Sequence, residues 1–198
     1  ETGDVVGVAN GEIYNHRELE HELRGRGHDF IPGPDTALLP HLYEERSHDF
    51  AEALDGMFAV ALWDRSSRML TLARDRAGEK PLFVAAHGRR FAFASEPGAL
   101  LQLPWIPRRP SPVSLARYLV HGGFAGEDCA YDAIRQLPPA HTLVVKDGVE
   151  RTRRYWRPWD ARVRRAAGSD LPRDGSDEAL VFSTGEALAR AFAARVPP

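Results

Sequence analysis

The sequence has almost no cysteine and no long hydrophobic run. Cys129 is the single cysteine among 198 residues, so an internal disulfide is excluded, which suits a reducing cytoplasm. No window approaches the roughly 18 apolar residues that a membrane-spanning helix needs. The formal net charge of −2 lacks the basic excess typical of proteins that bind phosphate backbones or anionic lipids. We therefore expect a cytoplasmic protein that binds neither nucleic acid nor membranes.

The sequence also lacks the usual spacings of metal and phosphate sites. Its eight histidines form neither H-x-x-x-H nor H-E-x-x-H, so no metal site is predicted. RDRAGEKPLF, residues 74–83, contains glycine, lysine and arginine without the G-x-x-x-x-G-K-[ST] order of a phosphate loop, and predicts a tight turn between strands. Cys129 follows two acidic residues that disfavour a thiolate, so we interpret it as an ordinary, partly buried cysteine.

What is present indicates an α+β protein. Short apolar runs predict strands, and helical periodicity with capping residues predicts helices on either side of them. The run 57–95 is typical of consecutive antiparallel hairpins. Asn15 and Ser111 are the predicted N-caps of two helices, and Pro40 should kink a third or delay its start. The predicted strands are 5–9, 57–64, 69–74, 81–86, 91–95 and 141–148, and the predicted helices are 16–27, 36–46, 49–54 and 112–121.

The two ends of the chain predict an incomplete domain and the start of another. The first residues, ETGDVV, contain no Met and lead at once into a strand, so we expect the chain to begin within a domain. Residues 159–176 hold proline, glycine and charge without apolar periodicity, which is typical of a linker. Helical spacing returns over 177–195, and a lone helix of this size does not fold by itself in water. We therefore divide the chain into a first domain (1–158), a linker (159–176) and the start of a second domain (177–198).

The stretch ANGEIYNH, residues 9–16, carries the clearest candidate chemistry. Asn10 offers two N–H donors, Gly11 allows close backbone approach and presents its own N–H, and Glu12 supplies an acceptor. Two donors that converge on one point can stabilise the oxyanion formed in acyl transfer. A simple Asn-Gly turn is the alternative. Asp35 stands at a loop-to-helix junction, where its carboxylate could cap the helix or bind a cation such as an α-ammonium, and spacing does not decide between them.

Several motifs in a fixed order resemble one family. The chain from about residue 4 to 157 is similar to the glutamine amidotransferase domain of glutamine-hydrolysing asparagine synthetase. The residues that carry the resemblance are NGEIYNHREL (10–19), DT (35–36), LDGMFAVALWD (54–64), LARDRAGEKPLF (72–83), FASEPGAL (93–100), IRQLPPAHTLVV (134–145) and RYW (154–156).

The resemblance implies a four-layer α/β/β/α sandwich of the N-terminal-nucleophile hydrolase type, incomplete at its N-terminus. In that family an N-terminal cysteine attacks the glutamine amide, and the ammonia passes to an ATP-using synthetase domain that amidates aspartate or a similar carboxylate. By carry-over, Asn10 and Gly11 form the oxyanion hole, Asn10, Gly11 and Glu12 line the glutamine pocket, and Asp35 binds the α-ammonium.

The resemblance also implies which partners belong to this chain. Glutamine and a synthetase domain of the same chain are the expected partners, and a homodimer is compatible with both. No cofactor is expected here, whereas ATP and Mg²⁺ are implied for the missing synthetase domain. The nucleophilic cysteine would precede Glu1, so we expect the chain alone to be inactive.

Two other interpretations stay open. The first is a non-catalytic, glutaminase-like scaffold of a β-lactam-synthetase-like paralogue, and the second is a related phosphoribosyl or sugar-phosphate amidotransferase. Departures from the family pattern, such as Ala37 and Gly98, leave the acceptor substrate open.

Overall fold

The computed structural model describes residues 4–29, 33–158 and 177–195. The chain divides into two compact units, residues 1–156 and 157–198, and each is described by itself. In the second unit the predicted helix is present as α6 (Asp177–Arg195). The predicted linker, 159–176, lies outside the described residues. No helix among the described residues is both long enough and apolar enough to cross a membrane.

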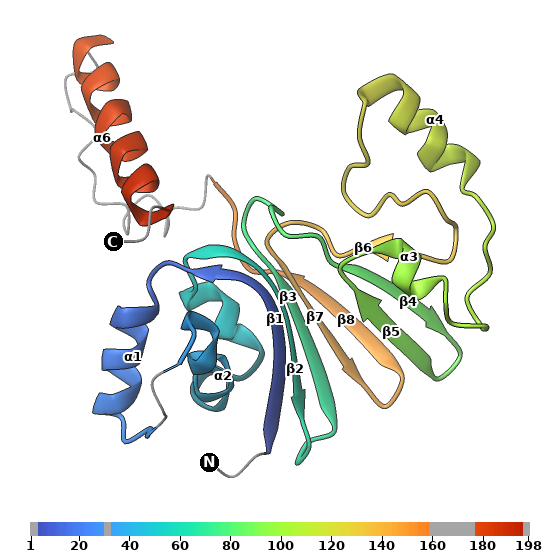
Figure 1. Cartoon of the computed structure of the whole chain (residues 1–198), viewed down its shortest axis with the longest axis horizontal. Coiled ribbons are helices and arrows are strands. Elements are labelled where there is room, and N and C mark those ends of the chain that lie inside the picture. Colours follow the sequence, from blue (N-terminus) through green and yellow to red (C-terminus); the bar gives the residue numbers. More distant parts are fainter. Residues whose placement is uncertain (1–3, 30–32, 159–176, 196–198) are drawn as a thin grey trace. The chain divides into compact units, whose positions relative to one another are not determined.

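The first unit is built on two antiparallel sheets (Figure 1). The larger has the order β1-β2-β3-β7-β8, so β1 and β8 are its edges. The smaller has the order β5-β4-β6. The strands of the large sheet are β1 (Val5–Ile13), β2 (Gly56–Asp64), β3 (Met69–Arg74), β7 (His141–Lys146) and β8 (Val149–Arg154), and those of the small sheet are β4 (Phe83–His87), β5 (Arg90–Ala94) and β6 (Arg135–Gln136).

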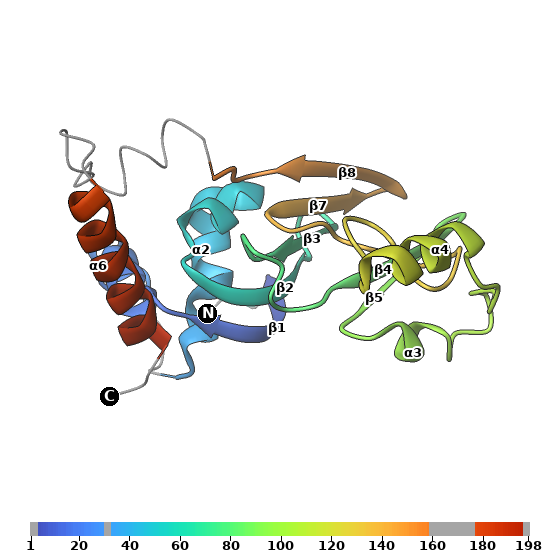
Figure 2. The same cartoon turned by 90° about the horizontal axis from the view of Figure 1, so that it is seen from above.

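Helices cover the outer face of the large sheet, whereas α3 (Pro97–Leu100) and the connection between β5 and β6 cover that of the small sheet (Figures 1 and 2). Four helices pack on the large sheet, and two lie with the long connection between β5 and β6 on the side of the small sheet. The first group is α1 (His16–Gly25), η1 (Asp35–Leu38), α2 (Leu39–Arg46) and η2 (Ser47–Ala53), and the second is α3 (Pro97–Leu100) and α4 (Pro112–His121).

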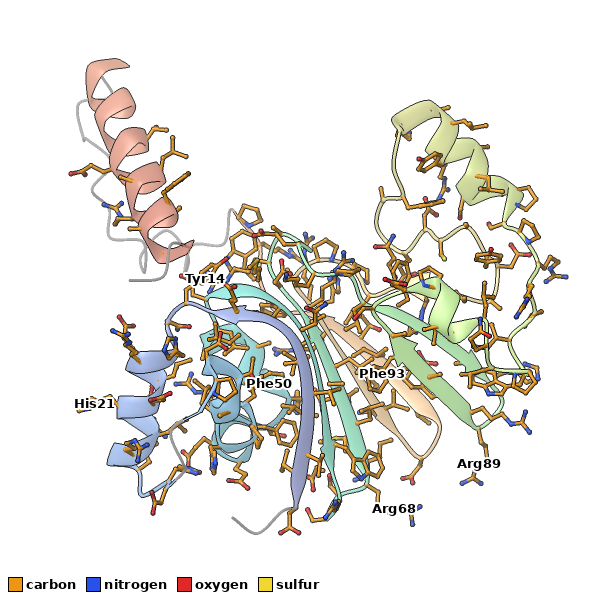
Figure 3. The ribbon with its side chains drawn as sticks, viewed as in Figure 1. Tyr14, His21, Phe50, Arg68, Arg89 and Phe93 are labelled. Carbon is orange, nitrogen blue, oxygen red and sulfur yellow. The ribbon has the colours of Figure 1, made fainter. Side chains whose placement is uncertain are left out.

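Strand periodicity explains why the layers separate into distinct cores. Along β2, Phe58, Val60 and Leu62 face the helices, whereas Ala59 and Ala61 face the small sheet. Phe50 is wholly buried among the residues of the helical side (Figure 3). A third cluster, which includes Cys129, lies on the far face of the small sheet. The predicted α/β/β/α layering is therefore present.

Two local features differ from the predictions. Asn10–Glu12 lie inside β1, because β1 continues to Ile13 where a strand was predicted only to residue 9. The consecutive hairpins predicted over 57–95 are confirmed as β2–β3 and β4–β5, although the two hairpins belong to different sheets. Strand β8 was not predicted, since VERTRR is too charged to resemble a strand.

Capping of the helices was predicted with mixed success. Ser111 accepts a hydrogen bond from the Ser114 amide at the start of α4, as expected. Asn15 precedes α1 but its side chain does not cap it. Instead it bonds the Ala53 carbonyl and the Asp55 amide, each at 2.9 Å, and so ties the end of β1 to the start of β2.

Candidate functional site

The candidate site begins at the exposed edge of the large sheet, where β1 has a neighbour on one side only. Hydrogen bonds from Tyr14 N–H to the Asp55 carbonyl (2.7 Å) and from Arg65 N–H to the Asp4 carbonyl (2.8 Å) show that even-numbered residues of β1 bond to β2. Because bonding alternates along an antiparallel pair, the odd-numbered residues point their N–H groups away from β2. The Gly11 amide therefore faces the free edge.

The register across β2 supports this orientation. Gly11 pairs with Phe58, and the Phe58 carbonyl accepts a bond of 2.9 Å from Asp75 N–H on the β3 side. A residue that bonds to β3 does not also bond to β1. The Gly11 amide is therefore not used in pairing β1 with β2.

Asp35 lies on the same edge. Its Oδ2 accepts a hydrogen bond of 2.5 Å from the Ile13 amide, which is the next outward N–H after that of Gly11. Pro34, not Asp35, occupies the N-cap position of η1, and no side chain caps that helix. The capping interpretation of Asp35 is therefore not what the structure shows. Its carboxylate is half-buried and has a second oxygen that can accept further bonds.

Gly11 is required by sterics at this position. Its φ is +148°, and a Cβ built on it would lie 2.0 Å from the Met57 carbonyl oxygen and 2.7 Å from Phe58 Cα. Both obstacles are backbone atoms, which cannot rotate away. Only glycine lets β1 and β2 approach this closely while leaving the Gly11 amide at the edge.

The Asn10 side chain lies on the face directed toward the small sheet. A cavity of about 140 Å³ opens there between β1, β2 and β5, and Phe93 closes one side of it (Figure 3). Glu12 is exposed and shares the face of Asn10, because the two are separated by two residues of one strand. The cavity is lined by Val8, Ala9, Asn10, Ala59, Val60, Ala61, Leu82, Phe93, Ala94 and Ser95.

The buried carboxylate of Asp75 holds the loop that follows β3, on the other side of β2. Asp75 is 0% exposed, and its carboxylate accepts backbone hydrogen bonds from Phe58, Ala77, Glu79 and Lys80 at 2.9–3.3 Å. One of these bonds reaches Phe58, the residue paired with Gly11. The loop thereby fixes the position of β2 behind the candidate site.

The Arg74 guanidinium completes that loop. It donates to the carbonyls of Gly78, Lys80 and Leu137, each at 2.8 Å. Burial lowers the pKa of Arg74. Burial has the opposite effect on Tyr155, because its charged form is the deprotonated one, and raises its pKa. The Tyr155 hydroxyl donates to the Arg74 carbonyl at 2.8 Å. In place of the predicted tight turn, residues 75–82 form a longer loop that joins β3 to β4 in the other sheet. Arg74 and Asp75 both bond to backbone groups there.

This loop does not suit a nucleotide phosphate. A phosphate loop binds its ligand with free backbone N–H groups, whereas the amides of Ala77, Glu79 and Lys80 already donate to Asp75. This loop therefore does not fit the phosphates of ATP.

A larger cavity, of about 340 Å³, lies away from Asn10 at the hairpin ends of the two sheets. Arg68 and Arg89 belong to the β2–β3 and β4–β5 turns that border it (Figure 3). Its lining combines three arginines with Asp147 and Glu150. None of the four predicted site residues lines it, so the smaller cavity and the β1 edge are the better candidate.

Cys129 takes no part in either cavity. It is 3% exposed and packs against Leu100, Ile106 and Ile134. Burial raises the pKa of its thiol, which disfavours the thiolate needed for attack. Its surroundings are those of a core residue.

Sequence reasoning found Asn10, Gly11, Glu12 and Asp35, and the structure places all four on or beside the end of β1. It missed the Ile13 amide, which joins Asp35 to β1 across 22 residues of sequence. It also missed a cluster of His28, His41 and Glu44 between α1 and α2. No local spacing signals the contact of Ile13 with Asp35 or that of His28 with His41.

The chain is similar to a known family over most of its length. The family model described as a glutamine amidotransferase domain matches residues 1–156. Asparagine synthetase [glutamine-hydrolyzing] 3 of Bacillus subtilis (strain 168) is 38% identical over 155 residues, 77% of this chain and 25% of that protein. A putative asparagine synthetase [glutamine-hydrolyzing] 1 of Methanocaldococcus jannaschii is 46% identical over 48% of this chain and 17% of that protein. The chain thus spans a quarter or less of these relatives.

Solved structures agree on the fold. Glutamine phosphoribosylpyrophosphate amidotransferase of B. subtilis, solved with ADP and GMP, superimposes with a TM-score of 0.53. It covers 79% of this chain and 30% of that chain at 19% identity. At this identity the likeness shows a shared fold alone.

Proposed function

This chain belongs to the glutamine amidotransferase domain family, and from that premise we propose that the edge of β1 binds L-glutamine as the donor of ammonia. Gly11 N–H and the Asn10 carboxamide are the donors for the side-chain carbonyl oxygen of glutamine. Asp35 binds its α-ammonium, and Glu12 lines the same pocket. Glutamine hydrolysis by this domain needs no cofactor.

The observation that carries this proposal is the common orientation of Gly11 and Asp35. The outward N–H groups of Gly11 and Ile13 are two residues apart, about 7 Å along a strand, and the Asp35 carboxylate sits on the second of them. An extended glutamine spans about 6 Å from its side-chain oxygen to its α-nitrogen. A single glutamine can therefore reach both groups along this edge.

The chemistry of these groups suits acyl transfer. During attack on an amide, the carbonyl oxygen gains negative charge, and two N–H donors stabilise it. Removing one such donor typically lowers the rate about 10²- to 10³-fold. We expect Asn10→Ala to lower kcat of a glutaminase-active, longer form of this protein by that factor while KM changes little.

In a longer protein of this kind, the ammonia would serve ATP-dependent amidation of aspartate or a similar carboxylate by a synthetase domain of the same chain. The names of the relatives, which join asparagine synthesis to glutamine hydrolysis, support this proposal. ATP and Mg²⁺ would belong to that domain, since the loop after β3 does not fit a nucleotide phosphate. A cytoplasmic location and a homodimer are compatible with this assignment.

The proposal can be tested by calorimetric titration of the 198-residue chain with L-glutamine and with glutaramate, the analogue that lacks the α-amino group. Asp35→Asn keeps an oxygen for the Ile13 amide but removes the negative charge. Loss of a charged hydrogen bond of about 1.5–3 kcal/mol should weaken L-glutamine binding about 10- to 100-fold. Glutaramate binding should not change. Glu18→Gln, at an exposed position of α1, is the matched control and should leave both affinities unchanged.

If Asp35→Asn lowered the affinities for L-glutamine and glutaramate equally, Asp35 would not bind the ammonium. A folded chain that binds no L-glutamine at all would instead favour the non-catalytic scaffold. The two results lead to different conclusions, because the first concerns one residue and the second concerns the whole site.

A further inference from the structure

Two histidines and a glutamate meet between α1 and α2, on the outer helical layer. His28 follows the end of α1, where its amide donates to the Leu23 carbonyl at 3.1 Å. His41 and Glu44 lie three residues apart in α2, on the same helical face. The cluster involves none of the residues assigned to glutamine, and its test is independent of that assignment.

The three side chains direct ligand atoms toward one point. Nδ1 of His28 lies 3.3 Å from Nδ1 of His41, and Oε2 of Glu44 lies 3.6 Å from each of these nitrogens. A point equidistant from the corners of this triangle is about 2.0 Å from all three, the length of zinc bonds to imidazole nitrogen and carboxylate oxygen. The imidazole rings are nearly perpendicular, at 77°, with centroids 5.3 Å apart, so the rings do not stack.

A second layer of contacts orients His28 for this role. Its Nε2 lies 3.0 Å from Oε1 of Glu45, and the other oxygen of Glu45 accepts from Arg26 at 2.9 Å. A proton held on Nε2 by the carboxylate leaves the Nδ1 lone pair directed at the cluster. Histidines that bind metals commonly donate their other N–H to a carboxylate in this way.

We propose that His28, His41 and Glu44 form a zinc site. The cation would be held by two neutral imidazoles and one carboxylate, and water would complete the coordination because Glu44 is exposed. His41 is buried and His28 nearly so, which restricts the ligands to few rotamers. The histidine spacings in the sequence predicted no metal site. They do not reveal this one because His28 lies outside α2, the helix that carries His41 and Glu44.

The position of the site indicates a structural role. A bound zinc would join the end of α1 to α2, and η1, which carries Asp35, lies between these helices in sequence. Metal that binds only the folded chain raises its stability in proportion to the logarithm of the free metal concentration. Zinc should therefore stabilise this helical layer without contacting glutamine.

The test is calorimetric titration of the untagged, EDTA-dialysed chain with Zn²⁺, with Co²⁺ absorption in the visible range as a probe of coordination geometry. We expect one equivalent of saturable binding, a Co²⁺ spectrum typical of four-coordination, and a rise in the thermal midpoint with added Zn²⁺. His41→Ala should abolish binding. Because His41 is buried, its replacement also removes packing, so the exposed Glu44→Gln provides a second test and should weaken binding clearly.

Two further variants make the test specific. Glu45→Gln contacts no metal and should weaken binding about 10- to 100-fold through His28. His21→Ala removes an exposed histidine on α1 (Figure 3) and should have no effect. Absence of saturable binding, or an unchanged affinity in Glu44→Gln, would overturn the proposal. Equal weakening by His21→Ala would also overturn it, since it would indicate adventitious binding to surface histidines.

Discussion

Replacing Asp75 with asparagine should destabilise the whole first unit. Each oxygen of this buried carboxylate accepts two backbone hydrogen bonds: Oδ1 from Ala77 and Glu79, and Oδ2 from Phe58 and Lys80. Asparagine keeps the shape but turns one oxygen into an NH₂ group. That group cannot accept, so two backbone N–H donors lose their partner and face another donor.

The magnitude follows from these contacts. Hydrogen bonds to charged groups are worth about 1.5–3 kcal/mol each, and a buried donor left unsatisfied pays its full desolvation cost. Loss of two such hydrogen bonds lowers the free energy of unfolding by about 3–6 kcal/mol. This is a large part of the roughly 5–15 kcal/mol that stabilises a typical domain. Asp75→Asn should therefore lower the free energy of unfolding by that amount or prevent folding.

Urea unfolding followed by circular dichroism measures this difference, and Asp64→Asn is the matched control. Asp64 also accepts four hydrogen bonds, from Ser66 and Ser67, but it is the last residue of β2 and is only partly buried. Water can replace those bonds, so Asp64→Asn should lower the free energy of unfolding by at most about 1 kcal/mol. Similar losses for the two variants would refute the argument that burial makes Asp75 important.

Other substitutions test neighbouring contacts. Gly11→Ala should cost about 2–5 kcal/mol in urea unfolding, from backbone strain and the clash with the Met57 carbonyl; a smaller cost than 1 kcal/mol would contradict the close approach of β1 and β2. Tyr155→Phe removes the bond to the Arg74 carbonyl and should cost about 0.5–1.5 kcal/mol by the same assay. Hydrogen bonds lower the pKa of Asp64 below its usual value of about 3.9. The contribution of the Asp64 carboxylate to the free energy of unfolding should therefore be complete above pH 4 and disappear as pH falls through the lowered pKa. The difference in stability between the wild type and Asp64→Asn should vanish in acid.

Sequence patterns predicted the layers well because burial sets them locally. The apolar runs of β2 and β3 and the capped helix α4 follow from periodicity and from Ser111. Strand β8 was missed because it is an edge strand whose charges pair outside it: Arg153 bonds Asp49 and Glu52, and Glu150 bonds Arg135.

The candidate site was predicted as a set of residues but not as an arrangement. The Asn10–Gly11 pair resembles a turn, yet pairing with β2 keeps it extended, because tertiary contacts outweigh local preference. Asp35 was predicted either to cap a helix or to bind an ammonium group, and its bond to Ile13 depends on packing of η1 beside β1. His28 and His41 meet only because α1 and α2 lie together, which no spacing rule encodes.

The central claim is that the outward amide of Gly11 and the carboxylate of Asp35 bind the two ends of one glutamine. Nuclear magnetic resonance of the ¹⁵N-labelled chain, titrated with L-glutamine, tests it most directly. The account predicts that the Gly11 and Ile13 amide signals shift together along one saturable curve, and that the Gly11 amide exchanges rapidly with solvent before glutamine is added. A Gly11 amide that is already protected, or that stays unchanged while glutamine saturates the chain, would contradict it.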